Sequence, residues 1–355
     1  MHKNLIQFLV CPSCRGELSL TELKHSGIGI EEGVLHCSGC RIDYPIIRGI
    51  PRLLPTDLLP KLVSDYDAFL ERYRLDRPLG ACGTSHATDE RIAKGFEFEW
   101  KKHSFILPEH EQEFLHVLGD VLSPGELEGR VVLDAGCGQG RFSYFSHKYG
   151  AKTVIAFDLG EQVLLASKNL QHCENIHVVQ ASIYNPPFKP VFDQVFSIGV
   201  IHHLPQPEEA FRTLFDLLRE EGKIFIWVYG YSSIIPVIRF LRKFTLHKGE
   251  RFNWMLALVF AVPLFGINQI YNVMKGSPWL KGLAEHIPFH MYHDRGFSNV
   301  WTICFDKINS GIAVYYRRQD LEGWLERLNG RKKTGVLSER YPGKSGSSWR
   351  LMAGR

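Results

Sequence analysis

The sequence has little excess charge and no hydrophobic run long enough to cross a bilayer. Its 355 residues carry 42 basic and 38 acidic side chains, a net charge of +4, and so small an excess does not by itself indicate a nucleic-acid partner. The longest apolar run, Trp254 to Ile267, contains Pro263 and has 14 residues, whereas a spanning helix needs about 20. We therefore predict no transmembrane segment.

The N-terminus also lacks the pattern of a signal peptide. Met1 to Val10 is a mixed stretch without a small-residue cleavage site. The eight cysteines are therefore expected in a reducing, cytoplasmic compartment, where closely spaced cysteines indicate metal more often than disulfide. A composition of 45% hydrophobic and 23% charged residues is that of a globular chain.

Four cysteines form two CxxC pairs near the N-terminus, at Cys11, Cys14, Cys37 and Cys40. Thiolates two residues apart on a tight turn face one ion, and two such turns complete a tetrahedral shell around zinc. Because four protein ligands leave no open position, we predict a structural Zn²⁺ in a ribbon over residues 1–55. Redox-active pairs are the alternative, although thioredoxin-type sites use a single CxxC.

The end of this unit, Tyr44-Pro-Ile-Ile-Arg-Gly-Ile-Pro-Arg-Leu-Leu-Pro55, together with the cysteine spacing, resembles the bacterial zinc-ribbon proteins related to methyltransferase activators. The resemblance implies a ribbon that supports or docks onto a methyltransferase. A polar linker is expected over residues 56–94.

A glycine-rich turn follows a short apolar strand at Arg130-Val-Val-Leu-Asp-Ala-Gly-Cys-Gly-Gln-Gly140. Glycines allow close approach of the backbone to a ligand, and the helix N-terminus after them favours an anionic group. Asp158 ends the next strand, where an acidic residue meets ribose hydroxyls in a βαβ unit. The strands and helices that alternate as far as Tyr229 predict a doubly wound parallel sheet. A nicotinamide dehydrogenase is the alternative, but it requires GxGxxG rather than GxGxG.

With Phe192-Asp193 and Ile198-Gly-Val-Ile-His-His-Leu204, residues 95–230 resemble a class I S-adenosylmethionine (SAM)-dependent methyltransferase. The resemblance implies SAM as cofactor. A serine stands at position 182, where members of this family commonly carry an acidic residue that contacts the adenine. Trp100 either caps the cofactor pocket or packs onto the core. The expected cofactor-binding residues are Trp100, Asp134, Ala135, Gly136, Gly138, Gly140, Asp158, Leu159, Ser182, Ile183, Gly199 and Val200.

The predicted fold is α/β, a Rossmann-like doubly wound seven-stranded sheet with the zinc ribbon and a helical cap. The cap is expected over residues 231–316, and residues 317–355 complete the sheet. Three interpretations of the apolar insertion stay open: a cap that buries these residues internally, a hydrophobic substrate pocket beneath it, and a peripheral membrane contact through residues 232–267.

Two histidines, His202 and His203, follow the fourth strand beside the expected methyl group. An oxygen or carbon acceptor must lose a proton, so these histidines are candidate bases, although both side chains could instead hold the loop. Asp306 is a candidate for orienting a polar acceptor. Asn185-Pro-Pro-Phe188 matches the NPPY/F signature of amino methyltransferases but precedes the fourth strand, so we interpret it as a loop.

The order of motifs resembles bacterial methyltransferases encoded with polysaccharide and secondary-metabolite pathways. We therefore predict methyl transfer to an oxygen or carbon of a small-molecule metabolite, apolar or glycosyl-type, with no strong nucleic-acid signal. The alternatives are an RNA methyltransferase that uses the ribbon for substrate docking and a non-catalytic activator. The oligomeric state is not predicted.

Overall fold

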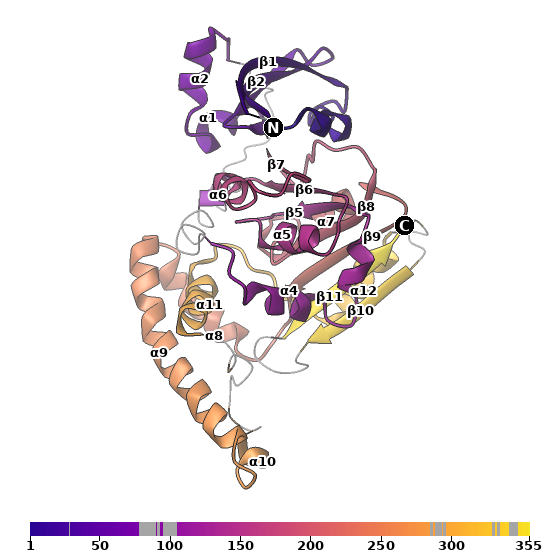
Figure 1. Cartoon of the computed structure of the whole chain (residues 1–355). Helices are drawn as coiled ribbons and strands as arrows, with labels where there is room; N and C mark the ends of the chain where they lie inside the picture. The colour runs from indigo at the N-terminus through magenta and orange to yellow at the C-terminus, as the bar shows by residue number, and fades with distance from the viewer. Residues whose placement is uncertain are drawn as a thin grey trace.

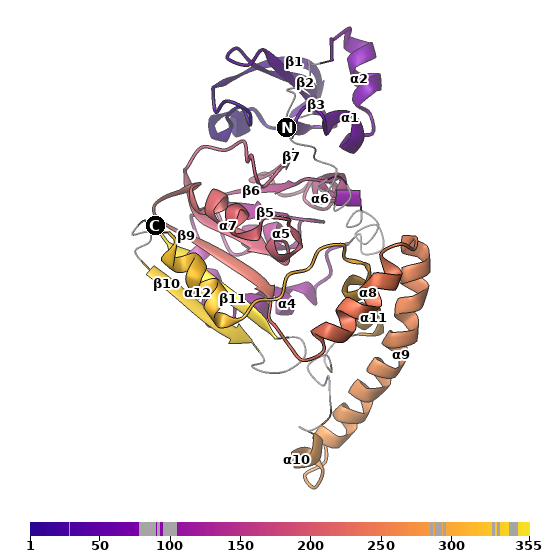
Figure 2. The ribbon, with the colours of Figure 1, turned by 180° about the vertical axis from the view of Figure 1, so that it is seen from behind.

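The computed structural model describes residues 1–27, 29–77, 90, 93–94, 105–284, 287, 293, 296–328, 331, 334–340 and 347–355. A small N-terminal unit lies at one end of the molecule, a twisted sheet flanked by helices lies in the middle, and a long helix projects at the other end (Figure 1). The reverse view in Figure 2 shows the same three parts in the same sequence.

The N-terminal unit is built on antiparallel strands. Strand β1 pairs with β2, β2 with β3 and β3 with β4. Its core contains Leu35, Tyr44 and Ile46, which are fully buried. The elements are η1 (Lys3–Phe8), β1 (Leu18–Ser26), β2 (Gly29–Cys37), β3 (Ile42–Ile47), β4 (Ile50–Leu53), α1 (Leu59–Leu62) and α2 (Tyr66–Tyr73).

Seven further strands form the central sheet in the order β7-β6-β5-β8-β9-β11-β10. All pairs are parallel except those of β11, which is antiparallel to β9 and to β10. This arrangement confirms the predicted seven-stranded α/β fold. The strands are β5 (Val131–Ala135), β6 (Thr153–Asp158), β7 (Ile176–Ala181), β8 (Phe192–Ile198), β9 (Leu218–Tyr229), β10 (Thr334–Arg340) and β11 (Ser348–Gly354).

Helices cover both faces of the sheet, because its strands are apolar on both sides. Phe211 and Trp324, from α7 and α12, belong to the core on one face. Phe114 and Phe145, from α4 and α5, belong to the core on the other. These elements are α4 (His110–Leu118), η2 (Pro124–Leu127), α5 (Arg141–Lys148), α6 (Gln162–Asn169), η3 (Ile201–His203), α7 (Pro207–Phe215) and α12 (Arg318–Glu326).

The ribbon continues the central sheet through its last strand. Strand β4 pairs in parallel with β7, Arg52 opposite Gln180 and Leu53 opposite Ala181, so that all strands form one 11-stranded sheet. The Arg52 side chain is 1% exposed, and its Nη1 donates to Gln180 Oε1 at 2.7 Å. The ribbon is thus docked in cis on the edge of the central sheet.

The insertion after β9 is helical, with α8 (Ile235–Thr245), α9 (Glu250–Lys275), α10 (Lys281–Ala284) and α11 (Phe297–Asn309). Helix α9 is far longer than the 14-residue apolar run, because its helical pattern continues past Ile267 to Lys275. By length and composition, with a mean hydropathy of 1.6 in its most apolar window, it is long enough to cross a bilayer. It is the candidate of this kind within the described residues.

Only one stripe of α9 is buried. Asn253, Ala257 and Ala261 pack toward α11, whereas Met255 and Val259 are 60% and 65% exposed. The interpretation that a cap buries residues 254–267 internally is therefore wrong for the exposed side of the helix. Helix α11 packs along the buried stripe of α9, and the exposed apolar residues lie on the other side of the helix.

Candidate cofactor site and active site

Four thiols gather in the ribbon, as the CxxC spacing predicts. The sulfur atoms of Cys11, Cys14, Cys37 and Cys40 all lie within 4.8 Å of one another. Cys14 Sγ lies 3.5 Å from Cys37 Sγ, and Cys11 Sγ lies 3.8 Å from Cys40 Sγ. A tetrahedral zinc with Zn–S bonds of about 2.3 Å requires sulfur separations of about 3.8 Å. The donor set therefore fits a structural zinc ion.

The glycine-rich turn has the backbone shape that a cofactor loop needs. Gly136 and Gly140 have φ of +81° and +90°. A Cβ on Gly136 would lie 2.4 Å from a methyl of Val200, and a Cβ on Gly140 would lie 2.6 Å from Leu170. Side chains at these positions would push the loop off β8 and α6, because L residues also avoid this φ. The turn therefore meets Val200 at the carboxyl end of β8.

Asp158 connects the end of β6 to this turn. Its carboxylate accepts hydrogen bonds from the backbone N–H of Gly138 at 2.9 Å, the N–H of Leu159 at 2.7 Å and Gln162 Nε2 at 2.6 Å. Burial raises the pKa of Asp158. The carboxylate is held in one orientation at the point where a ribose is expected.

Asp134 is almost completely buried and accepts a hydrogen bond from Ser143 Oγ at 2.6 Å. Burial raises its pKa to about 6. The neighbouring Ala135 is fully buried, and its carbonyl accepts from Ser197 Oγ at 3.1 Å. These contacts attach the first strand to helix α5 and to β8, and thereby support the glycine turn.

The remaining cofactor candidates lie at the ends of β7 and β8. Ser182 Oγ accepts the Tyr184 N–H at 3.2 Å in a local turn, and Ile183 beside it is 8% exposed. Gly199 has φ of +80° and faces Trp227. The structure therefore gathers the predicted residues of four strand ends at one edge of the sheet. Trp100 lies outside the described residues.

His202 is the most unusual side chain near this edge. It is fully buried, and neither ring nitrogen has a hydrogen-bond partner. Its ring centroid lies 3.9 Å from that of Tyr229 and 4.2 Å from that of His203. Burial and the charges of the neighbouring His203 and Lys307 hold the pKa of His202 well below its usual value, so the ring is neutral near pH 7.

His203 and Asp306 lie beside it, although more than 100 residues separate them in the chain. His203 Nδ1 donates to the Ile312 carbonyl at 2.8 Å, and Nε2 lies 3.9 Å from Asp306 Oδ1. The Asp306 carboxylate accepts from Tyr229 OH at 2.5 Å and Ser310 Oγ at 2.6 Å. Burial opposes its ionisation, but His203 and Lys307 hold the pKa of Asp306 below the usual value.

Four further residues complete this cluster, and the sequence analysis did not identify them as functional. Lys307 Nζ lies 3.6 Å from the centroid of the Tyr229 ring. Arg242 Nε donates to the Lys307 carbonyl at 2.7 Å, and Arg242 Nη2 donates to Tyr315 OH at 3.3 Å. Burial lowers the pKa of Lys307 to about 8. The adjacency of Lys307 to Asp306 was the one available sequence signal, since nothing in the helical spacing places Arg242 here.

The Asn185-Pro-Pro-Phe188 segment contacts the ribbon. Arg15 donates through Nη1 to the Pro186 carbonyl and through Nη2 to the Phe188 carbonyl, both at 2.5 Å. The Val10 N–H donates to the Pro187 carbonyl at 2.9 Å. The segment is a loop, as its position before the fourth strand predicts, and its contacts attach it to the ribbon.

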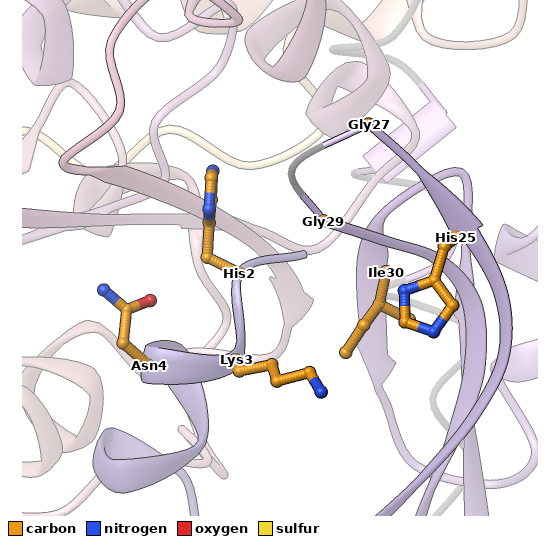
Figure 3. Close-up of a pocket in the computed structure, with 7 residues that line it drawn as sticks. All are labelled: His2, Lys3, Asn4, His25, Gly27, Gly29 and Ile30. Atoms are coloured by element: carbon orange, nitrogen blue, oxygen red, sulfur yellow. The ribbon is translucent and has the colours of Figure 1, made fainter.

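A pocket of about 370 Å³ lies in the ribbon, where Figure 3 shows the N-terminal residues beside the β1–β2 turn. Two side chains of its lining, Lys3 and His25, contact Glu22 at 2.6 Å and 2.9 Å. The pocket includes none of the cofactor or catalytic candidates. Its lining consists of His2, Lys3, Asn4, His25, Gly27, Gly29 and Ile30.

Comparison with known proteins identifies two domains. A methyltransferase domain family matches residues 133–226, and the Trm112p-like protein family matches residues 2–49. The tRNA U34 carboxymethyltransferase of Campylobacter hominis is 31% identical over 104 residues, 28% of this chain and 36% of that protein. The enzyme of the same name from Pseudoalteromonas atlantica is 33% identical over 103 residues, 28% of this chain and 32% of that protein. The matched region thus spans about a third of these relatives.

Among solved structures, the magnesium protoporphyrin IX methyltransferase of Synechocystis PCC 6803 is similar with a TM-score of 0.41 and 15% identity. The match covers 84% of this chain and 97% of that chain. An O-methyltransferase family protein from Burkholderia thailandensis has a TM-score of 0.39 and 12% identity, with 76% and 59% coverage.

These names correct the predicted partners. The predicted partners, a small-molecule substrate with no strong nucleic-acid signal, are contradicted by relatives at 31–33% identity that are named tRNA U34 carboxymethyltransferases. Net charge reports on how many phosphates a surface neutralises, so a near balance of charge does not exclude a nucleic-acid substrate.

The predictions of a class I methyltransferase and of an activator-type ribbon are confirmed by the two family matches. The predicted cofactors are confirmed with them, SAM by the methyltransferase domain and structural zinc by the four clustered thiols. The chain therefore carries a SAM-dependent methyltransferase domain with a Trm112p-like zinc ribbon docked on the edge of its sheet.

Proposed function

We propose that this protein transfers a methyl group from SAM to a base of RNA, with tRNA as the first candidate. The observation that carries the proposal is the buried aromatic cluster around His202, at the end of the strand that meets the cofactor loop. The ring centroids of His202 and Tyr229 lie 3.9 Å apart, and the rings of His203 and Trp227 each lie within 6.1 Å of both. Flat aromatic surfaces suit a nucleobase, because every base has a π face that stacks.

Cofactor binding is assigned to the glycine turn and to Asp158. When bound, SAM supplies an activated methyl group on a sulfonium. Gly136, Gly138 and Gly140 bring the backbone close to the methionine part, and Asp158 binds the ribose hydroxyls. Asp134, Ala135 and Leu159 support this loop, Ser182 and Ile183 flank the adenine, and Gly199 and Val200 lie below the transfer site.

His202 is proposed as the general base. A ring or exocyclic N–H, or a hydroxyl, must lose a proton when it is methylated, and a neutral imidazole accepts one. His202 is neutral and has a nitrogen lone pair with no protein partner. A buried polar atom without a partner is costly in a folded protein. A substrate whose N–H or O–H donates a hydrogen bond to this nitrogen would offset that cost.

His203 and Asp306 act as positioning residues in this proposal. The bond from His203 Nδ1 to Ile312 fixes the ring, and Asp306 holds the Tyr229 hydroxyl. The Tyr229 ring packs against the His202 ring at an interplanar angle of 39° and so restrains its plane. The ribbon is assigned to substrate docking, and the protein to the cytoplasm, where tRNA is modified.

The test is transfer of label from radiolabelled SAM into total cellular RNA, protein and small-molecule pools. The proposal expects label in RNA, lost in His202→Phe with SAM affinity unchanged by calorimetry. Asp158→Ala is the contrasting variant and should lose SAM binding itself. Label confined to protein or to small molecules would overturn the RNA assignment, and full transfer by His202→Phe would remove His202 as the base.

A further inference from the structure

Helices α8 and α9 each have two opposed faces, one packed and one exposed. In α9 the buried residues are Asn253, Ala257, Ala261, Asn268 and Tyr271. The exposed apolar residues lie on the other side in two runs with spacings of three or four positions. Exposed Gly266 occupies the matching position between Val262 and Ile270, so the two runs form one stripe. This exposed stripe consists of Phe252 (53%), Met255 (60%), Val259 (65%), Val262 (56%), Ile270 (57%) and Val273 (75%).

Helix α8 repeats the arrangement. Val237, Phe240 and Phe244 are 55–59% exposed, and the rings of Phe240 and Phe244 contact each other at 5.1 Å. The opposite side of α8 carries Ile238 and Arg242, which are buried. Beyond α9, Trp279 is 94% exposed. We call the exposed stripes of α8 and α9, with Trp279, the apolar face.

The charge of this segment is strongly one-sided. Residues 232–284 contain seven basic residues and one acidic residue, Glu250. Six of the basic residues are exposed, and the seventh, Arg242, belongs to the catalytic cluster. Lys248 lies 6.0 Å from the Phe252 ring, so a cation adjoins the start of the α9 stripe. The exposed basic residues are Arg239, Lys243, Lys248, Arg251, Lys275 and Lys281.

From these observations we infer that the apolar face docks on the surface of a bilayer that contains anionic lipid. Apolar and aromatic side chains enter the boundary between headgroups and acyl chains, and the lysines and arginines meet the phosphates. Tryptophan favours the same depth. The inference goes beyond the proposed function and does not depend on the acceptor.

The packing of α9 favours a helix that lies on the bilayer over one that crosses it. Trp254, Ala257 and Ala261 pack against Val300 and Phe305 of α11, and α11 also carries Asp306 and Lys307. A spanning α9 would take these ionisable groups into hydrocarbon, which is costly. Figures 1 and 2 both show α9 extending past α11 as a long arm at the end of the molecule opposite the ribbon.

The test is flotation of the full-length zinc-loaded chain with vesicles of phosphatidylcholine, with and without phosphatidylglycerol. We expect binding to the anionic vesicles and a loss of more than about tenfold in Val259→Ser/Val262→Ser/Val273→Ser. Each of the single variants Lys243→Gln, Lys248→Gln and Arg251→Gln should weaken binding to the anionic vesicles about fivefold at low salt. A matched control, Leu23→Ser/Leu115→Ser/Val336→Ser, removes exposed apolar residues outside the insertion and should bind as the parent does.

Unchanged circular dichroism and SAM affinity establish that each variant is folded. Absence of parent flotation, or equal flotation of the stripe variant, overturns the inference. If the parent binds no vesicles but sediments as a dimer, and Val259→Ser/Val262→Ser/Val273→Ser sediments as a monomer, the face binds a second copy of the chain instead. If the charge variants lose tRNA binding and not vesicle binding, the face is an RNA surface. Resistance to alkaline extraction from cell membranes shows a spanning helix; each of these three results also overturns the inference.

Discussion

The ribbon and the helical insertion are attached to the same sheet, and they are attached in opposite ways. The ribbon joins through strand pairing, a buried arginine and backbone hydrogen bonds to a loop. The insertion packs one side of each long helix on α11 and leaves the other side apolar and exposed. The interface of the ribbon is thus buried within the chain, whereas the insertion has an apolar surface that no described part of the chain covers.

Loss of zinc should have the largest effect of the changes considered, and it should unfold the ribbon. Structural zinc contributes about 10–16 kcal/mol of folding energy in small peptides, so Cys37→Ser or chelation should unfold the ribbon and expose the edge of β7. We expect rapid proteolysis within the first 77 residues and loss of bound zinc by metal analysis. Cys173→Ser, at a buried cysteine outside the cluster, is the control and should retain zinc.

The Arg52–Gln180 contact should have the next largest effect. Burial lowers the pKa of Arg52 to about 10, which marks how poorly this site is solvated. Gln180→Leu leaves a buried charge without its acceptor and should cost about 2–3 kcal/mol in denaturant unfolding. Arg52→Met/Gln180→Leu removes the unpaired charge and should recover that part of the loss. The Leu62 and Leu159 carbonyls, to which Gln180 Nε2 donates, lack this donor in both variants. Additive losses in the double variant would contradict this account.

The two stripes of α9 should respond differently to substitution. Ala261 is fully buried against α11, so Ala261→Leu overpacks that side and should lower the free energy of unfolding by about 1–3 kcal/mol. Val262, its neighbour, is exposed, and Val262→Ser should change stability by less than about 0.5 kcal/mol in the absence of lipid. Equal costs at the two positions would show that the exposed stripe is covered within the chain.

Lys307 should give the smallest effect, one that depends on pH. It faces Asp306 and Arg242, lies over the Tyr229 and Tyr315 rings, and burial lowers its pKa to about 8. Between pH 8 and about 10 the unfolded lysine holds a proton that the folded one has lost, so stability rises with pH. Relative to Lys307→Met, the parent should gain about 1 kcal/mol over this window, after allowance for solvent screening. A flat difference would show that the ammonium is well solvated.

The catalytic candidates show how far local pattern reaches. His202 and His203 follow a strand in a recognisable motif, so their position at the carboxyl edge was predictable from the chain alone. Helices and loops of the insertion contribute Lys307, Arg242 and Tyr315 to the same cluster. Local sequence pattern does not predict how these elements pack on one another. These residues join the cluster because α8 and α11 pack over the end of β9.

The sequence by itself determined the parts that depend on short-range chemistry. Two CxxC turns specify a Cys₄ shell, a glycine turn after a buried strand specifies the cofactor loop, and alternating apolar segments specify the α/β sheet. Only the tertiary structure decided that β4 extends this sheet through β7, that Arg52 is buried there, and that α9 is exposed along one side. Strand partners and helix burial depend on what lies across the interface. The identity of an apolar residue does not by itself show whether its side chain faces a core or is exposed.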